Sequence, residues 1–349
     1  MSKRQLNRRQ RWRIEKVQSE RLARAQRKQA QRDDDVADQL GDEQAGLITA
    51  HYGSKVEVES LLDGSRQRCH FRANLAQLVV GDRVLWQPAQ SSGDGVVVAI
   101  DERTSVLCRP DNYGKLKPVA ANVDRMLIVF APAPVPSSQL LDRYLVAAEL
   151  SGITPVLVLN KADLIDEVLR PYFDELSAIY HDLGYPLLEA SAADAHGLST
   201  LREALVGHTC VFVGQSGVGK SSLVNVLLPD AELATNVLSD VSGLGQHTTT
   251  TARLFHLPDG GNLIDSPGIR EFGLWHIDED ELLRGYRELA PLAGHCRFRN
   301  CSHLHEPGCA LTGAVEAGDI SAERLENYYR IRETLDETAR QRYDRSNND

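Results

Sequence analysis

The glycine-rich stretch at residues 214–222, GQSGVGKSS, constrains the fold more than any other part of the chain. It fits the phosphate-cradling pattern G-x-x-x-x-G-K-[ST] without a mismatch. An apolar run at 210–213 precedes it, and apolar residues recur at helical spacing over 223–227. The sequence therefore predicts a buried strand, a glycine turn and a helix N-terminus in that order, which is the context that phosphate binding requires.

The residue types in this stretch, here called the phosphate loop, suit a nucleoside triphosphate and its metal. Glycines let backbone N–H groups curve around the phosphates, and the helix dipole favours the anion. Lys220 is expected to reach the outer phosphates, and the Ser221 hydroxyl to ligate Mg²⁺. The alternative is a glycine-rich turn that happens to precede a helix. The predicted binding residues are Gly214, Gln215, Ser216, Gly217, Val218, Gly219, Lys220, Ser221 and Ser222.

A second loop, here called the base loop, indicates which base is bound. An apolar strand candidate at 155–159 ends in the tetrapeptide N-K-A-D, which contains Asn160, Lys161 and Asp163. The Asp163 carboxylate can accept two hydrogen bonds from guanine, whereas adenine offers no such donor pair. We expect the stem of Lys161 to lie on the ring and Asn160 to tie this loop to the phosphate loop. The loop therefore selects GTP over ATP.

Three further segments supply the remaining parts of a guanine-nucleotide site. A strand candidate at 185–190 ends in Ser191 and Ala192, whose backbone is expected to contact the guanine carbonyl. The polar loop at 243–251 is predicted to be the first switch, with Thr250 and Ser221 as magnesium ligands. A strand followed by D-x-x-G then forms the second switch, which places Asp265 near the metal and the Gly268 N–H near the γ-phosphate.

These parts occur in an unusual order, because the base loop comes before the phosphate loop. Ordinary GTPases begin with the phosphate loop. Moving the chain break is permissible, since the termini of a domain commonly lie close together on its surface. The sequence therefore predicts a circularly permuted P-loop GTPase domain of the α/β class, with a doubly wound parallel sheet.

Short strand candidates with turn residues between them occupy the region before this domain. They lie at 47–50, 55–58, 68–72, 82–86 and 95–100. Five short strands in about 75 residues favour a small barrel of the OB type, which often binds RNA. An SH3-like barrel fits the spacing almost as well. Beyond residue 118 the pattern changes to alternating strands and helices, with a helix capped by Ser137 or Ser138 and ended by Gly152.

Charge is distributed unevenly along the chain. Residues 1–32 contain twelve Lys or Arg against Glu15 and Glu20, a net charge of +10, which leaves −20 for the rest of a chain whose total is −10. This basic arm cannot bury a core, and we expect it to bind nucleic-acid phosphates, a solubilising tail being the alternative. No apolar run approaches the ~18 residues of a membrane-spanning helix, so the sequence predicts a cytoplasmic protein without a membrane partner.

A cysteine and histidine cluster follows the GTPase motifs. The pattern C-x₄-C-x-H-x₅-C brings together Cys296, Cys301, His303 and Cys309, the composition of a closed structural zinc site. His305 is an alternative nitrogen ligand, and unligated buried thiols are the other explanation. Six cysteines, unevenly placed, do not suggest a disulfide framework. An amphipathic helix is predicted over 325–335, with a packing role.

This ordered set of motifs resembles the RsgA or YjeQ family of circularly permuted bacterial GTPases that depend on the small ribosomal subunit. The chain then divides into a basic arm at 1–45, an OB domain at 46–119, a permuted GTPase domain at 120–275, and a zinc domain with a C-terminal helix at 276–349. The resemblance implies one zinc ion, Mg²⁺ with GTP, and docking on the small subunit and its rRNA late in maturation, with GTPase activity stimulated by the subunit. We expect the protein itself to be a monomer.

The catalytic group is predicted from a missing glutamine. In Ras-like enzymes a Gln after D-x-x-G orients the attacking water, but here that position is Ile269. His247, beside the threonines of the first switch, is the best candidate to hold the water instead. The family resemblance points to the same histidine. The alternative is a loop histidine that contacts only rRNA or solvent.

Three other functions agree less well with these motifs. A P-loop kinase or ATPase is disfavoured by the guanine-selecting Asp163. A non-catalytic RNA-binding protein with a vestigial nucleotide site is disfavoured because Lys220, Ser221 and Asp265 are intact. A permuted GTPase acting on the large subunit or another RNA target is disfavoured by the barrel in front and the zinc motif behind.

Overall fold

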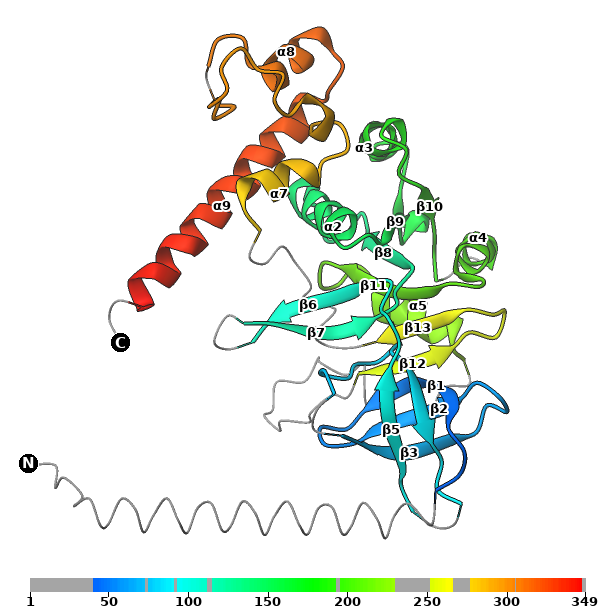
Figure 1. Cartoon of the computed structure of the whole chain (residues 1–349). Helices are drawn as coiled ribbons and strands as arrows, with labels where there is room; N and C mark the ends of the chain where they lie inside the picture. Colours follow the sequence, from blue (N-terminus) through cyan, green and yellow to red (C-terminus); the bar gives the residue numbers. More distant parts are fainter. Residues whose placement is uncertain are drawn as a thin grey trace, which may run out of the picture.

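A sheet of eleven strands runs through the N-terminal barrel and the central α/β domain (Figure 1). The structure, a computed structural model, describes residues 40–72, 75–90, 93–111, 115–192, 195–229, 252–265, 277–304 and 306–346. In Figure 1 the barrel lies at one end, the α/β domain in the middle and the C-terminal helices at the other end. No helix among the described residues is both long and apolar enough to cross a membrane.

The barrel contains the five strands that the sequence predicted. They are β1 (Gln44–His51), β2 (Val56–Ser60), β3 (Arg66–Phe71), β4 (Arg83–Gln87) and β5 (Gly95–Ile100). Alternate residues face inward, so that Ile48, Val58, Trp86 and Val97 are almost fully buried. The strand order is β1-β2-β3-β5-β4, and β4 pairs back with β1. The parallel pairing of β3 with β5 is typical of an OB fold and excludes the SH3-like alternative.

The α/β domain is built on parallel strands in the order β10-β9-β8-β11-β13, with β12 antiparallel at the end. The strands β8 and β11 are buried along almost their whole length, as expected for a parallel sheet covered on both faces. Helices pack on the two faces. The strands are β8 (Arg125–Phe130), β9 (Thr154–Leu159), β10 (Leu187–Glu189), β11 (Thr209–Gly214), β12 (Arg253–His256) and β13 (Asn262–Asp265), and the helices are α2 (Ser138–Leu150), η1 (Ala162–Leu164), α3 (Arg170–Asp182), α4 (Ala195–Leu205) and α5 (Lys220–Leu227).

Helix α2 begins and ends where the sequence predicted. The Ser137 hydroxyl oxygen accepts a hydrogen bond from the Leu140 N–H, so Ser137 rather than Ser138 is the cap. Gly152 follows the helix with a φ of +65°. The helix buries Leu141, Tyr144 and Leu145 against the sheet. The cap, the end and the buried face of α2 are therefore those that the sequence predicted.

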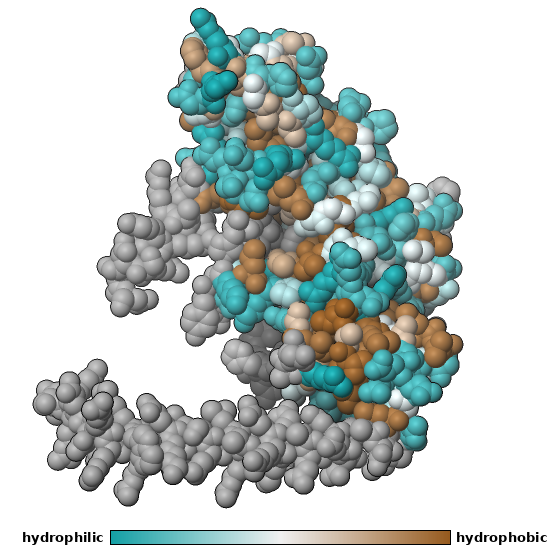
Figure 2. Space-filling model, viewed as in Figure 1, coloured by the Kyte–Doolittle hydropathy of each residue, from teal (hydrophilic) through white to brown (hydrophobic). Residues whose placement is uncertain are grey.

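Three strands were not predicted. Strands β6 (Val106–Pro110) and β7 (Leu116–Ala121) form a separate hairpin, whose outer residues are exposed and whose two prolines weaken the strand pattern. Strand β12 pairs with β1 of the barrel through Ala50 and Arg253, which joins the barrel to the α/β sheet. In the view of Figure 2, hydrophobic residues are most evident over the lower part, where these two units meet.

The C-terminal unit consists of short helices packed around one long helix. These are α7 (Glu279–Arg284), η3 (Ala290–Leu292), α8 (Ala310–Ala317) and α9 (Ala322–Ser346). Helix α7 starts with a capping box formed by Asp278 and Glu281. The predicted amphipathic face is confirmed, since Leu325, Tyr328 and Ile331 of α9 are buried in the core that also contains the face of α2.

Candidate nucleotide site and metal cluster

The predicted nucleotide loops converge at one edge of the α/β sheet. Strand β11 leads into the phosphate loop, β9 into the base loop, and β10 toward Ser191 and Ala192. These three strands run parallel with β8, so their carboxyl ends lie at the same edge. Ligands of doubly wound sheets bind at this edge. The topology therefore brings together segments that are far apart in the sequence.

The phosphate loop has the conformation that its glycines permit. Gly214 and Gly219 have φ values of 138° and 92°. A Cβ on Gly214 would lie 2.1 Å from the Val129 carbonyl oxygen, and one on Gly219 would lie 2.4 Å from Asn160 Nδ2. The Lys220 ammonium donates to the carbonyl oxygens of Gly214 and Gln215, each at 2.7 Å. Its charge therefore lies within the curve of the loop.

The base loop is bonded directly to the phosphate loop. Asn160 is 1% exposed, and its Nδ2 donates to the Val218 carbonyl oxygen at 2.8 Å, the tie that was expected from sequence. Lys161 has a φ of 57°, and its ammonium donates to the carbonyl oxygens of Gly217 at 2.8 Å and Ala133 at 2.7 Å. The two loops therefore form one connected unit.

Sequence reasoning missed a role for the Ser191 side chain. Only a backbone contact was expected there, but the buried Ser191 hydroxyl donates to Asp163 Oδ1. This hydrogen bond holds the carboxylate that is predicted to read the base. The signal was present in the sequence as a hydroxyl after a short strand, but nothing local indicates which carboxylate such a hydroxyl contacts.

The sequence predicts Tyr144 as a core residue of α2. In the structure it also lies against the phosphate loop. Burial raises the pKa of the Tyr144 hydroxyl, although a hydrogen bond from the backbone N–H of Gly214 opposes this effect. The phenol is 5% exposed. Helix α2 therefore contacts Gly214, the first residue of the phosphate loop, through the Tyr144 hydroxyl.

Several predicted residues lie outside the described part of the chain. They are His247, Thr250, Gly268 and His305, together with the basic arm. The described magnesium candidates are Ser221, in the first turn of α5, and Asp265, the last residue of β13. Strand β13 pairs in parallel with β11, so Asp265 lies on the strand next to the one that leads into the phosphate loop.

The four predicted zinc ligands do come together. One ligand atom from each of Cys296, Cys301, His303 and Cys309 lies within 4.8 Å of all the others. Cys296 Sγ is 3.4 Å from His303 Nδ1 and 4.0 Å from Cys309 Sγ, and Cys309 Sγ is 3.6 Å from the same nitrogen. Tetrahedral zinc with bonds of about 2.0–2.3 Å separates its ligands by roughly 3.5–3.8 Å. The spacing therefore fits zinc.

The surroundings of this cluster also suit thiolate ligands. The backbone N–H of Ala310 donates to Cys296 Sγ at 3.2 Å. Burial opposes ionisation of the Cys309 thiol, but N–H groups at the start of α8 and the His303 ring outweigh it and lower its pKa to about 6. Burial and the neighbouring sulfurs raise the pKa of Cys301 to about 11. Bound zinc would favour the thiolate at every position.

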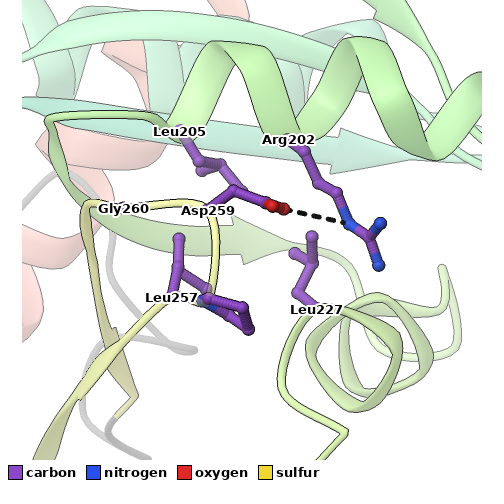
Figure 3. Close-up of a pocket in the computed structure, with 7 residues that line it drawn as sticks. Arg202, Leu205, Leu227, Leu257, Asp259 and Gly260 are labelled. Carbon is purple, nitrogen blue, oxygen red and sulfur yellow. Dashed lines mark ion pairs between the residues drawn. The ribbon is translucent and has the colours of Figure 1, made fainter.

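A small pocket lies at the other edge of the sheet (Figure 3). It is formed by the ends of α4 and α5 and by the β12–β13 turn, and an ion pair of 3.6 Å between Arg202 Nε and Asp259 Oδ2 lies beside its apolar residues. Because ligands of such sheets bind at the carboxyl ends of the strands, we do not assign this pocket to the nucleotide. It is lined by Arg202, Leu205, Leu227, Leu257, Pro258, Asp259 and Gly260.

The chain is similar to proteins of one family over nearly its whole length. Residues 100–275 match the family model described as RsgA GTPase. The chain is 66% identical over 349 residues to "Small ribosomal subunit biogenesis GTPase RsgA" of Alcanivorax borkumensis, which covers 98% of this chain and 99% of that protein. It is 57% identical over 339 residues to a Pseudomonas aeruginosa protein of the same name, covering 97% and 99%.

Two solved structures share the fold. The crystal structure of YjeQ from Thermotoga maritima matches with a TM-score of 0.70 and 34% identity, over 84% of this chain and 99% of that one. The structure of YloQ, described as a circularly permuted GTPase, matches with a TM-score of 0.69 and 30% identity, over 85% and 96%. The name of the second structure agrees with the permuted order of motifs in this chain.

Proposed function

Because the chain belongs to the RsgA GTPase family, and is therefore a GTP hydrolase, we propose that it acts late in the maturation of the small ribosomal subunit. In this proposal the subunit stimulates GTP hydrolysis, and the nucleotide state controls docking and release. The observation that carries it is the 66% identity, over 98% of the chain, to a protein named for small-subunit biogenesis. The connected base and phosphate loops support the nucleotide part.

The nucleotide would be held between the two loops. Asp163, fixed by Ser191, would accept from the edge of guanine, while Lys220 would move from its carbonyl partners to the outer phosphates. Both interactions follow from positions at the carboxyl edge of the sheet. The proposed binding residues are Asn160, Lys161, Asp163, Ser191, Ala192, residues 214–222, Asp265 and Gly268.

Magnesium would be held near the phosphates by Ser221, with Thr250 of the first switch and with Asp265 close by. The ion supplies neutralisation of charge on the transferred phosphoryl group. The residue after D-x-x-G is Ile269, which cannot orient water. We therefore propose His247 for that role, since an imidazole can accept a proton from water near neutral pH.

Zinc would be held by Cys296, Cys301, His303 and Cys309. The donor set is closed, which suits a structural ion rather than a catalytic one. Apart from Cys309, the ligands are only partly buried, so the ion would stabilise this segment. The described residues contain no other group of three or more candidate ligands that approach one another in this way.

Contacts to rRNA would come from the barrel and the basic arm. The guanidinium carbons of Arg68 and Arg253 lie 5.2 and 6.0 Å from the centre of the Tyr52 ring. An aromatic ring beside two exposed arginines offers both stacking and phosphate contacts. The arm adds a net charge of +10.

We further propose that the protein is a cytoplasmic monomer. Analytical ultracentrifugation of the purified chain would test the monomeric state.

Turnover with purified ribosomal subunits tests this proposal. GTP hydrolysis is measured with the protein alone, with small subunits and with large subunits. We expect strong stimulation by small subunits alone, and Lys220→Ala serves as the control that the activity belongs to this site. Stimulation by neither subunit, or by the large subunit only, would overturn the proposed function.

A further inference from the structure

The segment that leads into helix α2 is packed against the nucleotide loops. The Lys161 ammonium bridges the Ala133 carbonyl oxygen and the Gly217 carbonyl oxygen, at 2.7 and 2.8 Å. A Cβ on Gly217 would lie 3.6 Å from Pro134 Cδ, so the lead-in passes close beside the phosphate loop. Nearly two turns into the helix, the Tyr144 hydroxyl accepts a hydrogen bond from the Gly214 N–H. A shift of α2 along its axis would therefore move both loops.

The opposite face of α2 holds a buried ion pair with the C-terminal helix. Asp142 is 0% exposed and Arg324 of α9 is 1% exposed, and Arg324 Nη1 donates to Asp142 Oδ1. Two neutral donors complete the carboxylate, Tyr180 at 2.8 Å and Asn327 at 2.9 Å. Glu288, which follows α7, binds Arg324 Nε at 2.7 Å. The pair therefore joins α2 to three other elements of the structure.

The buried ion pair between Asp142 and Arg324 fixes the geometry of the two helices more than it stabilises the fold. Ion pairs excluded from water gain little over apolar residues of the same size, because both charges lose their hydration. What such a pair does provide is a single permitted geometry, since any displacement leaves a charge without its partner. The Arg324 guanidinium also lies over the Tyr286 ring, 4.5 Å from its centre, which restricts it further. Helix α2 is thus held in one position relative to α9.

Helix α2 also contacts the element that follows the second switch. A Cβ on Gly285, at the end of α7, would lie 2.4 Å from Val146 Cγ1 of α2. Only glycine permits this approach without a shift. Helix α7 begins at Glu279, eleven residues after Gly268 of the second switch. Helix α2 therefore contacts the phosphate loop through Tyr144 and α7 at Gly285, and its lead-in contacts the base loop through Ala133.

We propose that helix α2 couples the nucleotide site to the C-terminal unit, and that Asp142 is a positioning residue whose contact with Arg324 sets the place of the phosphate and base loops. The proposal rests on the nucleotide site proposed above. Because coupling between two sites is reciprocal, nucleotide binding must then stabilise the surroundings of Arg324 to the same degree that Arg324 assists binding. Both effects, of nucleotide on the surroundings of Arg324 and of Arg324 on nucleotide binding, can be measured without the ribosome.

Amide hydrogen exchange of the full-length protein tests the first half. Exchange over residues 322–335 is compared for the protein alone, with GDP, and with the imido analogue of GTP. We expect nucleotide to slow exchange in this segment of α9. Binding of the nucleotide, measured separately by calorimetry, shows whether a negative result comes from the coupling or from the proposed site itself. If the nucleotide binds and α9 exchange is unchanged, the proposal is wrong.

The variant Asp142→Asn tests the second half. It is isosteric, and Arg324 keeps Glu288, so the fold should persist, which circular dichroism checks. We expect about fivefold or greater weakening of GDP affinity, a matching rise in KM for GTP, and loss of the exchange response in α9. Glu326→Gln is the control, since it removes an exposed ion pair with Arg330 within α9. A second variant, Arg324→Lys, keeps the charge but cannot bind Asp142 and both carboxylate oxygens of Glu288 at once, and should show a smaller effect of the same kind.

A purely structural pair predicts a different outcome. Asp142→Asn would then lower the melting temperature while GDP affinity, KM and the exchange response stayed at the values of the unaltered protein. That result would overturn the proposal. If Asp142→Asn does not fold, Tyr180→Phe, which removes one hydrogen bond to the same carboxylate, gives the same comparison with a milder change.

Discussion

Replacing Asp163 by Asn should exchange the base preference of the protein from guanine to xanthine. In the proposed site, the carboxylate accepts two hydrogen bonds, from N1–H and from the exocyclic amine of guanine. Hydrogen bonds to a charged group contribute about 1.5–3 kcal/mol each. Loss of both amounts to about 3–6 kcal/mol, or a weakening of GTP binding by about 10²- to 10⁴-fold.

The structure also predicts how the new amide would be oriented. The Ser191 hydroxyl donates to Asp163 Oδ1, and the carbonyl oxygen of an asparagine can accept that same hydrogen bond. The amide NH₂ would then face the base, where it complements the second carbonyl of xanthine and opposes the amine of guanine. Xanthosine triphosphate should therefore bind the variant at least about tenfold more tightly than GTP does.

Calorimetric titration with GTP and xanthosine triphosphate measures both effects. Asp174→Asn is the matched control, because it makes the same change at an exposed position of α3. It should leave both affinities unchanged. GTP affinity within twofold of the unaltered protein for Asp163→Asn would show that this carboxylate does not read the base, and the assignment of the base loop would have to be abandoned.

Three further changes test the other proposed parts. Cys301→Ser should lose the zinc equivalent and loosen residues 296–309 while leaving GDP affinity nearly intact, because the cluster lies apart from the nucleotide loops; a full equivalent by metal analysis would contradict the ligand set. Deletion of residues 1–32 should weaken binding to small subunits and flatten its dependence on salt, since fewer counterions are released; an unchanged slope would show that the arm takes no part. His247→Ala should keep GTP affinity and subunit binding but lose roughly 10²-fold of the stimulated turnover; turnover at the unaltered rate would mean that another group positions the water.

The motifs of the proposed nucleotide and zinc sites can be found in the sequence because their chemistry is local. The glycines of the phosphate loop, the Asn160 to Asp163 tetrapeptide and the four zinc ligands each lie within a stretch of at most fourteen residues. Their backbone conformation and ligand spacing hardly depend on the rest of the fold. The buried runs at β8, β9 and β11 likewise identify a parallel sheet, since strands covered on both faces carry uninterrupted apolar residues.

The barrel type was decided only by the tertiary structure. As a pattern, five short strands favour an OB barrel but fit an SH3-like barrel almost as well, and the parallel pairing of β3 with β5 distinguishes them. The β6–β7 hairpin and β12 were missed because most of their residues are exposed or half-buried. Strand pairing is set by which surfaces are buried together, and that depends on residues far apart in the chain.

The Asp142–Arg324 pair shows the same limit for side chains. In the sequence, Asp142 is an ordinary charged residue of an amphipathic helix, and its partner follows 182 positions later. The pair exists because α2 and α9 pack face to face and exclude water from both charges. The sequence alone determined the local chemistry of each motif, while the packing of distant elements decided which side chains lost their solvent and so needed each other, because desolvation is a property of the folded surroundings and not of the residue.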